Sequence, residues 1–184
     1  MNRVEPTLAP RERKPVVLTT VPYYLPGFKG GGKLVTARNL VAGLRDRFRF
    51  KVMTADRDLG DARRYPGIEA NRWTKSGVGE IFYAGTRPDS VNTIRRQLCE
   101  SEHDVLHLNS VFSPRFAVAP LMLRRFGSIP RKPMIIAPRG EFAPGALAIK
   151  SPRKNIFLAL ARKLGWLDGV TWQASSEDEA RDIR

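Results

Sequence analysis

Residues 16–34 read VVLTTVPYYLPGFKGGGKL, and this stretch decides the fold. The apolar run over 16–21 is typical of a buried parallel strand, and the apolar positions from Leu34 onward are spaced by three or four, as in a helix. Between them lie Gly30, Gly31 and Gly32. A helix that begins without side chains lets an anionic group approach bare N–H groups and the positive end of the helix dipole. The stretch therefore predicts a strand–loop–helix unit that binds a phosphate or an anionic sugar derivative. The alternative is a turn that only needs positive φ angles.

Two common phosphate-binding patterns fit this loop poorly. A nucleoside-triphosphate P-loop requires Ser or Thr after the lysine to ligate magnesium, but Leu34 follows Lys33. A dinucleotide-binding loop requires G-x-G-x-x-G directly after the strand, and the glycine spacing here differs, although Asp56 is suitably placed after the next predicted strand. A less regular diphosphate or sugar site remains.

Strands and helices alternate along the rest of the chain. We expect strands over 48–55, 68–73, 80–83, 103–108, 134–137 and 170–174, and helices over 91–99, 113–125, 152–164 and from Glu177 onward. The helix over 113–125 should be kinked at Pro120, whose ring removes one backbone hydrogen bond. Such alternation predicts a Rossmann-like α/β fold, with a parallel sheet, helices on both faces and ligands beyond the carboxyl ends of the strands.

The composition fits one globular domain. The 184 residues are 42% hydrophobic and contain one cysteine, Cys99. No apolar run approaches the roughly 18 residues of a membrane-spanning helix. Residues 1–14 are polar and lack the apolar segment of a secretion signal, so we interpret them as an extension that precedes a domain over 15–184. These features predict a cytoplasmic location.

The charge points to an anionic partner or surface, because the net charge is +14 and the isoelectric point is near 10.7. Between Val105 and Leu167 there are eleven basic residues and a single acidic one, Glu141. Around the apolar stripe of the helix predicted over 152–164 lie Arg153, Lys154, Arg162 and Lys163. The simpler interpretation is a helix that packs on the sheet with a basic outer face. The alternative is an anionic membrane surface as its partner.

Other partners and ligands are poorly supported. We do not expect nucleic acid as a partner, because the sequence has no recognised module and no interleaved exposed aromatics. Asp56-Arg57-Asp58 is a DxD sequence that could ligate a divalent cation, but Asp and Gly also cluster in turns, so we expect no metal. Two histidines and one cysteine are too few for zinc. We interpret His107 as a hydrogen-bonded histidine of the core or cleft edge and place His103 in solvent.

Five motifs follow one another in the order found in a known family. They are PGFKGGG at 26–32, which we call the glycine loop, TADRDLGD at 54–61, DVLHLNSVFS at 104–113, APRGEF at 137–142 and SSEDEA at 175–180. Together they resemble the N-terminal domain of the family-4 (group 1) glycosyltransferases, over nearly the whole chain after Pro15. The resemblance implies one half of a GT-B fold, in which two Rossmann-like domains face each other across a cleft.

The resemblance also implies a function. Members of that family transfer a sugar from a nucleotide sugar to an acceptor, with retention of configuration and without an essential metal. For this chain it implies a glycan or lipid-linked acceptor, as in polysaccharide biosynthesis, no cofactor, and a peripheral location on the inner face of a membrane. By position, Gly31 and Gly32 match the family's glycine pair near the donor phosphates and the transferred sugar, with Gly30 beside them. Asn109 falls where many members carry a histidine that contacts this sugar.

Three more residues and one absence complete the comparison. Arg139, Gly140 and Glu141 would line the floor of the cleft. The family's paired-glutamate motif does not occur in these residues, so we expect the chain to be the first half of a longer protein and inactive by itself. The catalytic residues are not identified. A basic Rossmann-like domain that binds an anionic partner without catalysis is the alternative function.

Overall fold

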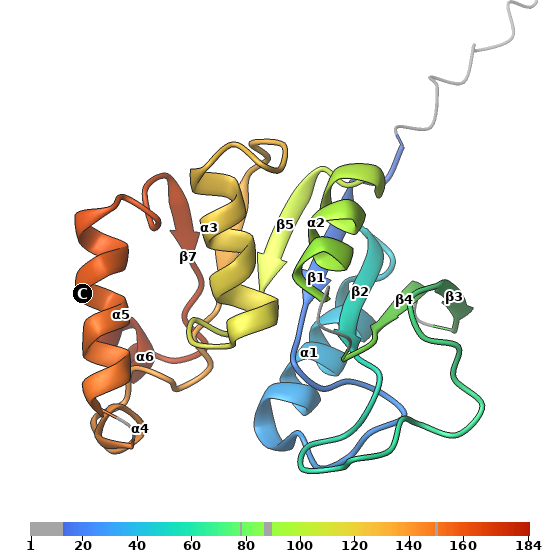
Figure 1. Cartoon of the computed structure of the whole chain (residues 1–184), viewed down its shortest axis with the longest axis horizontal. Coiled ribbons are helices and arrows are strands. Elements are labelled where there is room, and N and C mark those ends of the chain that lie inside the picture. The colour runs from blue at the N-terminus through green and yellow to red at the C-terminus, as the bar shows by residue number, and fades with distance from the viewer. Residues whose placement is uncertain (1–12, 78, 87–89, 150) are drawn as a thin grey trace, which may run out of the picture.

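The computed structural model describes residues 13–77, 79–86, 90–149 and 151–184 (Figure 1). Its strands are β1 (Val16–Thr20), β2 (Arg49–Ala55), β3 (Trp73–Ser76), β4 (Gly79–Ala84), β5 (Val105–Leu108), β6 (Met134–Ile136) and β7 (Val170–Trp172). Its helices are α1 (Gly31–Leu44), α2 (Ser90–Glu100), the π-helical turn η1 (Pro114–Val118), α3 (Ala119–Arg125), α4 (Pro144–Ala148), α5 (Ser151–Lys163) and α6 (Glu177–Ile183). Most of the predicted N-terminal extension, and Lys150, lie outside the described residues.

The strands form one sheet in the order β3-β4-β2-β1-β5-β6-β7. All neighbouring strands are parallel except β3 and β4, which are antiparallel. Val17 of the central strand β1 lies beside Phe50 of β2 on one side and Val105 of β5 on the other. The strand order therefore reverses between β1 and β5, which is where open α/β sheets leave room for ligands. The predicted Rossmann-like α/β fold is confirmed.

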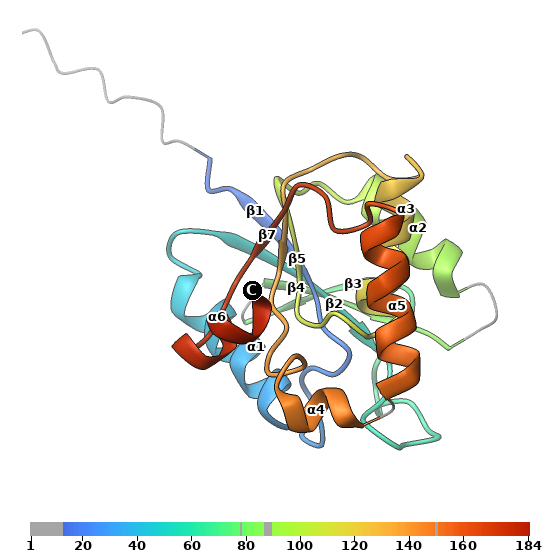
Figure 2. The same cartoon turned by 90° about the vertical axis from the view of Figure 1, so that its left-hand side faces the viewer.

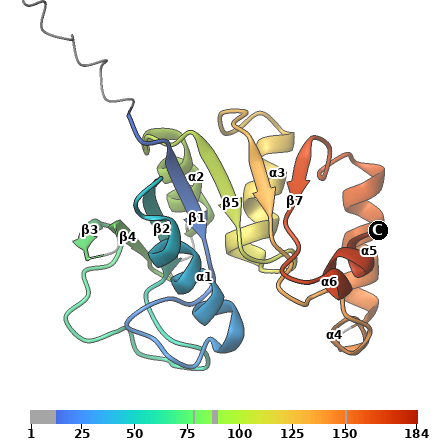
Figure 3. The same ribbon diagram turned by 180° about the vertical axis from the view of Figure 1, so that it is seen from behind.

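Helices cover both faces of the sheet, as predicted. Figures 1 and 3, seen from opposite sides, show α1 on one face and α2 with α3 on the other. The strand side chains divide in the same way, because successive residues of a strand point to opposite faces. Leu18 and Met53 belong to the core that includes Ile94 of α2, whereas Val52 belongs to the core that includes Val41 of α1.

The interruption expected at Pro120 takes the form of η1, the widened turn before α3. Its backbone bonds span five residues, as from the N–H of Ala119 to the carbonyl of Pro114. Pro120 has no N–H to donate to the carbonyl of Phe116. The hydroxyl of Thr20 donates to that carbonyl instead, at 2.6 Å. The proline is thus accommodated by a side chain from the end of β1, which fixes α3 against the central strand.

The antiparallel edge strand differs from the prediction of a strand over 68–73. The structure begins β3 at Trp73, where that segment ends. The Trp73 ring packs against Phe82 with 5.3 Å between centroids, and its Nε1 donates to Gln97 Oε1 at 2.7 Å. This anchoring of one aromatic side chain, which a local pattern does not reveal, places the start of the strand. The short helix α4 was also not predicted.

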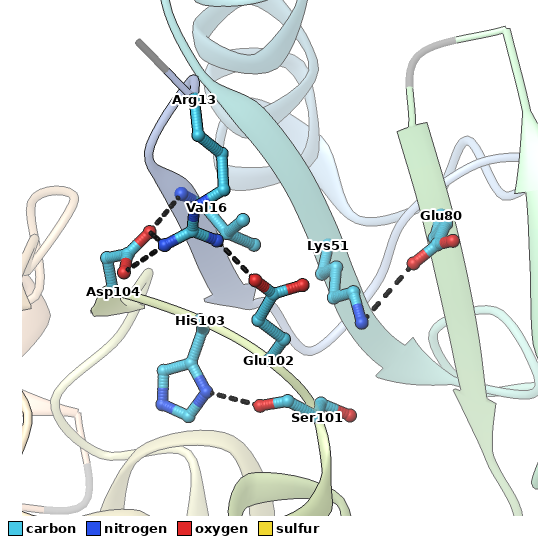
Figure 4. Close-up of polar contacts among 8 residues, drawn as sticks. All are labelled: Arg13, Val16, Lys51, Glu80, Ser101, Glu102, His103 and Asp104. Carbon is cyan, nitrogen blue, oxygen red and sulfur yellow. Dashed lines mark hydrogen bonds and ion pairs between the residues drawn. The ribbon is translucent and has the colours of Figure 1, made fainter.

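The amino ends of β1 and β5 are joined by polar contacts (Figure 4). Asp104 accepts from the N–H of Val16 at 2.7 Å and from the Arg13 guanidinium at 3.0 Å. His103, placed in solvent by the sequence analysis, is instead buried, and its Nδ1 lies 2.7 Å from the carbonyl oxygen of Ser101. Burial lowers the pKa of His103, because it disfavours the charged imidazolium.

Candidate functional site

A hollow of about 620 Å³ lies where the strand order reverses, at the carboxyl ends of the strands. It is lined by the loops after β1, β2, β6 and β7 and by the start of α1. The lining residues are Pro22, Tyr23, Gly30, Gly32, Lys33, Thr36, Leu59, Arg139, Gly140 and Ser175. Four of the predicted site residues therefore meet in one place, although the chain separates the glycine loop from Arg139 by more than half its length.

Asp58 stabilises the glycine loop through hydrogen bonds to its backbone. One oxygen of this buried carboxylate accepts from the N–H groups of Phe28 at 2.7 Å and Lys29 at 3.0 Å, and the other from the N–H of Leu59 at 2.9 Å. Burial acts to raise the pKa of Asp58, but these three backbone donors outweigh it and lower the pKa below its ordinary value. The second aspartate of the DxD sequence is thus used to order the loop.

The three glycines differ in what surrounds them. A Cβ on Gly30 would lie 2.8 Å from the Cβ of Tyr23, so this residue is a glycine for lack of space. Gly31 has a φ of +62°, a conformation that side chains disfavour. A Cβ on Gly32 would meet no atom within 4 Å and this residue lines the hollow. Gly30 at the helix start supplies no side-chain cap, and the first turn of α1 has no acidic residue. An anion in the hollow could therefore accept hydrogen bonds from the first turn.

Arg139 lies across the hollow from the glycine loop, directly after β6. Its φ of +55° is unusual for a residue with a side chain, and Gly140 follows with +76°. Nη2 and Nε of Arg139 donate to Oδ1 of Asn109 at 3.1 and 3.3 Å. Burial lowers the pKa of the Arg139 guanidinium, and the negative charge of Glu179 only partly offsets this effect. A strained backbone and a fixed guanidinium are typical of a residue that is positioned for a ligand.

Asn109 lies beneath Arg139 and is fully buried. Its amide nitrogen donates to Thr19 Oγ1 at 2.7 Å, and its oxygen accepts from Arg139. The buried Asn109 side chain therefore orients the guanidinium of Arg139 through these two hydrogen bonds. It is not among the residues that line the hollow.

His107 contacts the same threonine as Asn109. Thr19 Oγ1 lies 3.1 Å from its Nδ1, and Oε1 of Gln173 lies 2.9 Å from its Nε2. Because Gln173 Oε1 can only accept, the imidazole proton is on Nε2 and Nδ1 accepts from Thr19. Burial is the main cause that lowers the pKa of His107 to about 4. The prediction of a hydrogen-bonded core histidine is confirmed.

Glu141 connects the first turn of α1 to the loop after β5. Its carboxylate pairs with the ammonium group of Lys33 and accepts from Ser110 Oγ at 2.8 Å. It also accepts from the N–H groups of Val111 at 2.5 Å and Phe112 at 3.2 Å. Glu141 is thus occupied by protein donors, and Lys33 is the member of this pair that lines the hollow.

Glu179 lies in the SSEDEA motif, but the sequence predicted no role for it; the structure bonds it to two lining residues of the hollow. From α6 its carboxylate accepts from the N–H of Gly140 and from the N–H and hydroxyl of Ser175, each at 2.6 Å. Burial acts to raise its pKa, but these hydrogen bonds outweigh that effect and lower it. The spacing of Ser176 and Glu179 is that of a helix cap, and Ser176 Oγ does accept from the N–H of Glu179 at 3.1 Å. That local pattern hid the longer-range partner, Gly140.

The basic residues of α5 lie away from the hollow. Arg153, Arg162 and Lys163 are exposed. Lys154 is half-buried instead, because its ammonium group donates to the carbonyl of Ala146 and lies 5.2 Å from the centroid of the Phe112 ring. The four residues therefore do not form a single outward row.

The described residues hold neither a metal-binding cluster nor a membrane-spanning helix. No three His, Cys, Asp or Glu side chains there gather in a way that could hold a metal ion. None of the helices there is long and apolar enough to cross a bilayer. Comparisons with family models, with curated proteins and with solved structures found no match.

Proposed function

We propose that this chain is the N-terminal, acceptor-side domain of a retaining glycosyltransferase that moves a sugar from a nucleotide sugar to a glycan or lipid-linked acceptor. Four of the five sequence motifs that suggested this family contribute residues to the lining of the hollow. The single observation that carries the proposal is the meeting of the bare glycine loop with Lys33 and Arg139 across one hollow at the strand reversal.

The chemistry of the hollow suits an anionic sugar derivative. The N–H groups in the first turn of α1, which no side chain caps within the described residues, and the guanidinium of Arg139 are donors for a diphosphate. The hydroxyl oxygens of Ser175 and Thr36, whose protons are donated to Glu179 and to the carbonyl of Gly32, can accept from the hydroxyls of a sugar. In this proposal Gly30, Gly31 and Gly32 admit the donor, and no metal or cofactor is required. The domain would work in the cytoplasm, peripherally at the inner face of a membrane.

The test measures ligand binding and turnover separately. Titration calorimetry of the chain with a nucleotide diphosphosugar should show weak binding that a chelator does not change, and a product assay should show no glycoside, because half a cleft does not position both substrates. Sugar transfer by this chain alone would contradict the proposal that it forms only one half of the active site. Binding that survives Gly32→Val and Arg139→Ala unchanged would place the ligand elsewhere and overturn the site.

A second candidate function is a binding domain for an anionic partner without catalysis. The observation that favours it is the charge of +14, of which much lies outside the hollow. The same calorimetry separates the two functions. Under this alternative, inorganic pyrophosphate and unrelated polyanions should bind as tightly as the nucleotide sugar, whereas a sugar site should prefer the complete donor.

A further inference from the structure

The apolar side chains of α5 and of Leu164 directly after it, predicted as one stripe, divide between two faces. Ala161 is buried, and Phe157 packs inward with its ring centroid 6.0 Å from that of Trp166. Ile156, Leu160 and Leu164 are exposed by 60, 44 and 41%. These three residues follow one another at intervals of four, so they form a single row along the outside of the helix. We call them the outer row. Figure 2 shows α5 running along one side of the molecule.

The neighbours of the outer row are basic. Arg153 precedes Ile156 by three positions and Lys163 follows Leu160 by three, so both lie on the same face as the row. Both are exposed, and the sequence of α5 contains no acidic residue. An exposed aliphatic row with cations at its two ends is the arrangement of a helix that lies in a membrane interface.

A second hollow, of about 450 Å³, lies at the end of the outer row. We call it the arginine hollow, and it is lined by Arg124, Arg125, Arg131, Gly165, Asp168 and Gly169. Nε of Arg125 donates to the carbonyl of Leu164 at 2.7 Å, which joins the hollow to the last residue of the row. The terminal nitrogens of Arg125 make no hydrogen bond within the described part of the chain. Phe126, the next residue, is 66% exposed.

Arg124 is the fixed member of the arginine hollow. Its terminal nitrogens donate to the carbonyls of Asp168 at 2.9 Å and Gly169 at 3.3 Å. Its Nε is buried and has no partner among the described residues. Asp168 contributes the one carboxylate of the lining. Three guanidinium groups against one carboxylate leave the hollow with a net positive charge, suited to a phosphodiester.

We propose that α5 docks on an anionic membrane, with the outer row among the lipid chains and a lipid phosphodiester in the arginine hollow. Aliphatic side chains supply the insertion and arginines the attraction to the headgroups. The proposal deepens the peripheral location proposed above and rests on it. It does not depend on sugar transfer, because these residues lie apart from the lining of the site hollow.

Charge and side-chain chemistry argue against two other occupants. A second copy of the chain on the same face would bring two sets of arginines together, because symmetric interfaces pair a patch with itself. A nucleic acid would leave Ile156, Leu160 and Leu164 without a partner, since bases stack on aromatic or guanidinium planes. A bilayer is the occupant that satisfies both the row and the arginines.

The experiment measures sedimentation of the chain with vesicles at low and at raised salt. Vesicles of phosphatidylcholine with phosphatidylglycerol should retain the chain, and vesicles of phosphatidylcholine alone should not. Raised salt should weaken retention without abolishing it at once, because the apolar row is not screened. Glycerol phosphate added as a competitor distinguishes a bilayer from a free phosphate. A site for a free phosphate alone would be emptied by it, whereas docking through the row would persist.

Two variants with matched controls complete the test. Leu160→Ser with Ile156→Ser should reduce the vesicle partition coefficient by about tenfold or more, and the control Val35→Ser, on the other face of the sheet, should not change it. Arg125→Gln with Arg131→Gln should also reduce it by about tenfold. Its control, Arg63→Gln with Arg64→Gln, removes equal charge from an exposed loop.

The outcomes are unambiguous. Equal losses in both arginine pairs would mean attraction by net charge only and would overturn the hollow. Retention that is unchanged by the substitutions in the outer row would contradict docking through α5. Two other results would contradict it as well: a dimer in ultracentrifugation that Leu160→Ser dissociates, and tight binding to RNA at physiological salt. Titration of nucleotide sugar in the same samples shows separately whether the sugar site fails.

Discussion

The ammonium group of Lys33 is paired with the carboxylate of Glu141, 108 positions later in the chain. The pair ties the first turn of α1 to the turn after β6. Because the same carboxylate accepts from the backbone of Val111 and Phe112, the loop after β5 is tied in as well. Three loops that could move independently are therefore cross-linked around the candidate sugar site.

This arrangement predicts that the two partners of the pair contribute unequally. Glu141→Gln should lower the free energy of unfolding by about 1–3 kcal/mol, because buried donors around it lose a charged acceptor. Lys33→Met should cost about 1 kcal/mol or less, since its ammonium group is partly exposed and Glu141 keeps its other donors. Urea denaturation of both variants measures this. Equal losses would show that the pair alone, rather than the loop contacts, stabilises the structure.

Arg139 should separate stability from binding. Its φ of +55° costs a residue with a Cβ about 1 kcal/mol relative to glycine. Arg139→Gly and Arg139→Ala both remove the guanidinium, so both should lose nucleotide-sugar binding. Arg139→Gly should nevertheless be more stable than Arg139→Ala by about 1 kcal/mol. Thermal unfolding and calorimetry of the pair check this. If Arg139→Ala is the more stable of the two, the backbone at this position is not strained.

His107 predicts a loss of stability in mild acid. The pKa of the imidazole is near 6.5 when unfolded and about 4 when folded. Between these values the unfolded chain binds a proton that the folded chain does not, so stability falls as the pH is lowered, by up to about 3 kcal/mol. His103 acts in the same direction, so the share of His107 is the difference between the chain and His107→Gln. Denaturation of both between these pH values should give a shallower slope for the variant, and parallel curves would contradict the assignment.

The sequence predicted the alternation of strands and helices because burial on both faces leaves a periodic pattern in each segment. Through motifs at strand ends it also predicted Gly30, Gly32, Arg139 and Gly140 as site residues, and these four line one hollow. It did not give Asn109 its buried position or reveal that Glu179 accepts from Gly140. These contacts join segments far apart in the chain, so no local pattern records them. The exposure of the Leu160 side chain was not predicted either, because a helix with apolar residues on two adjacent faces shows a single broad apolar stripe in its sequence.

Asp58 should matter for the glycine loop and not for a metal. Asp58→Asn keeps one acceptor but removes the charge that three backbone N–H groups face. We expect a loss of about 1–3 kcal/mol in stability and weaker nucleotide-sugar binding from the loosened loop. Treatment with a chelator should leave both quantities unchanged in the parent chain. A chelator effect that disappears in Asp58→Asn would show that the carboxylate holds a cation instead.

The glycines give the sharpest separation of site from fold. Gly30→Val should destabilise the chain, because its Cβ would lie 2.8 Å from Tyr23. Gly32→Val should leave the melting temperature within a few degrees of the parent, since a Cβ there meets no described atom within 4 Å. It should nevertheless abolish nucleotide-sugar binding, because the added side chain blocks the approach to the first turn of α1. Gly43→Val is the matched control, because it adds the same side chain to an open position of the same helix and should spare binding. Thermal unfolding and calorimetry on the three variants measure stability and nucleotide-sugar binding separately.

Three outcomes would contradict close approach of the ligand to Gly32. If Gly32→Val loses binding only in step with stability, the loop is merely a permissive turn. If it binds like Gly43→Val, the ligand does not approach α1. If Lys33→Ala is more damaging than Gly32→Val, a P-loop-like contact from the lysine accounts for the site better than close approach to the glycines.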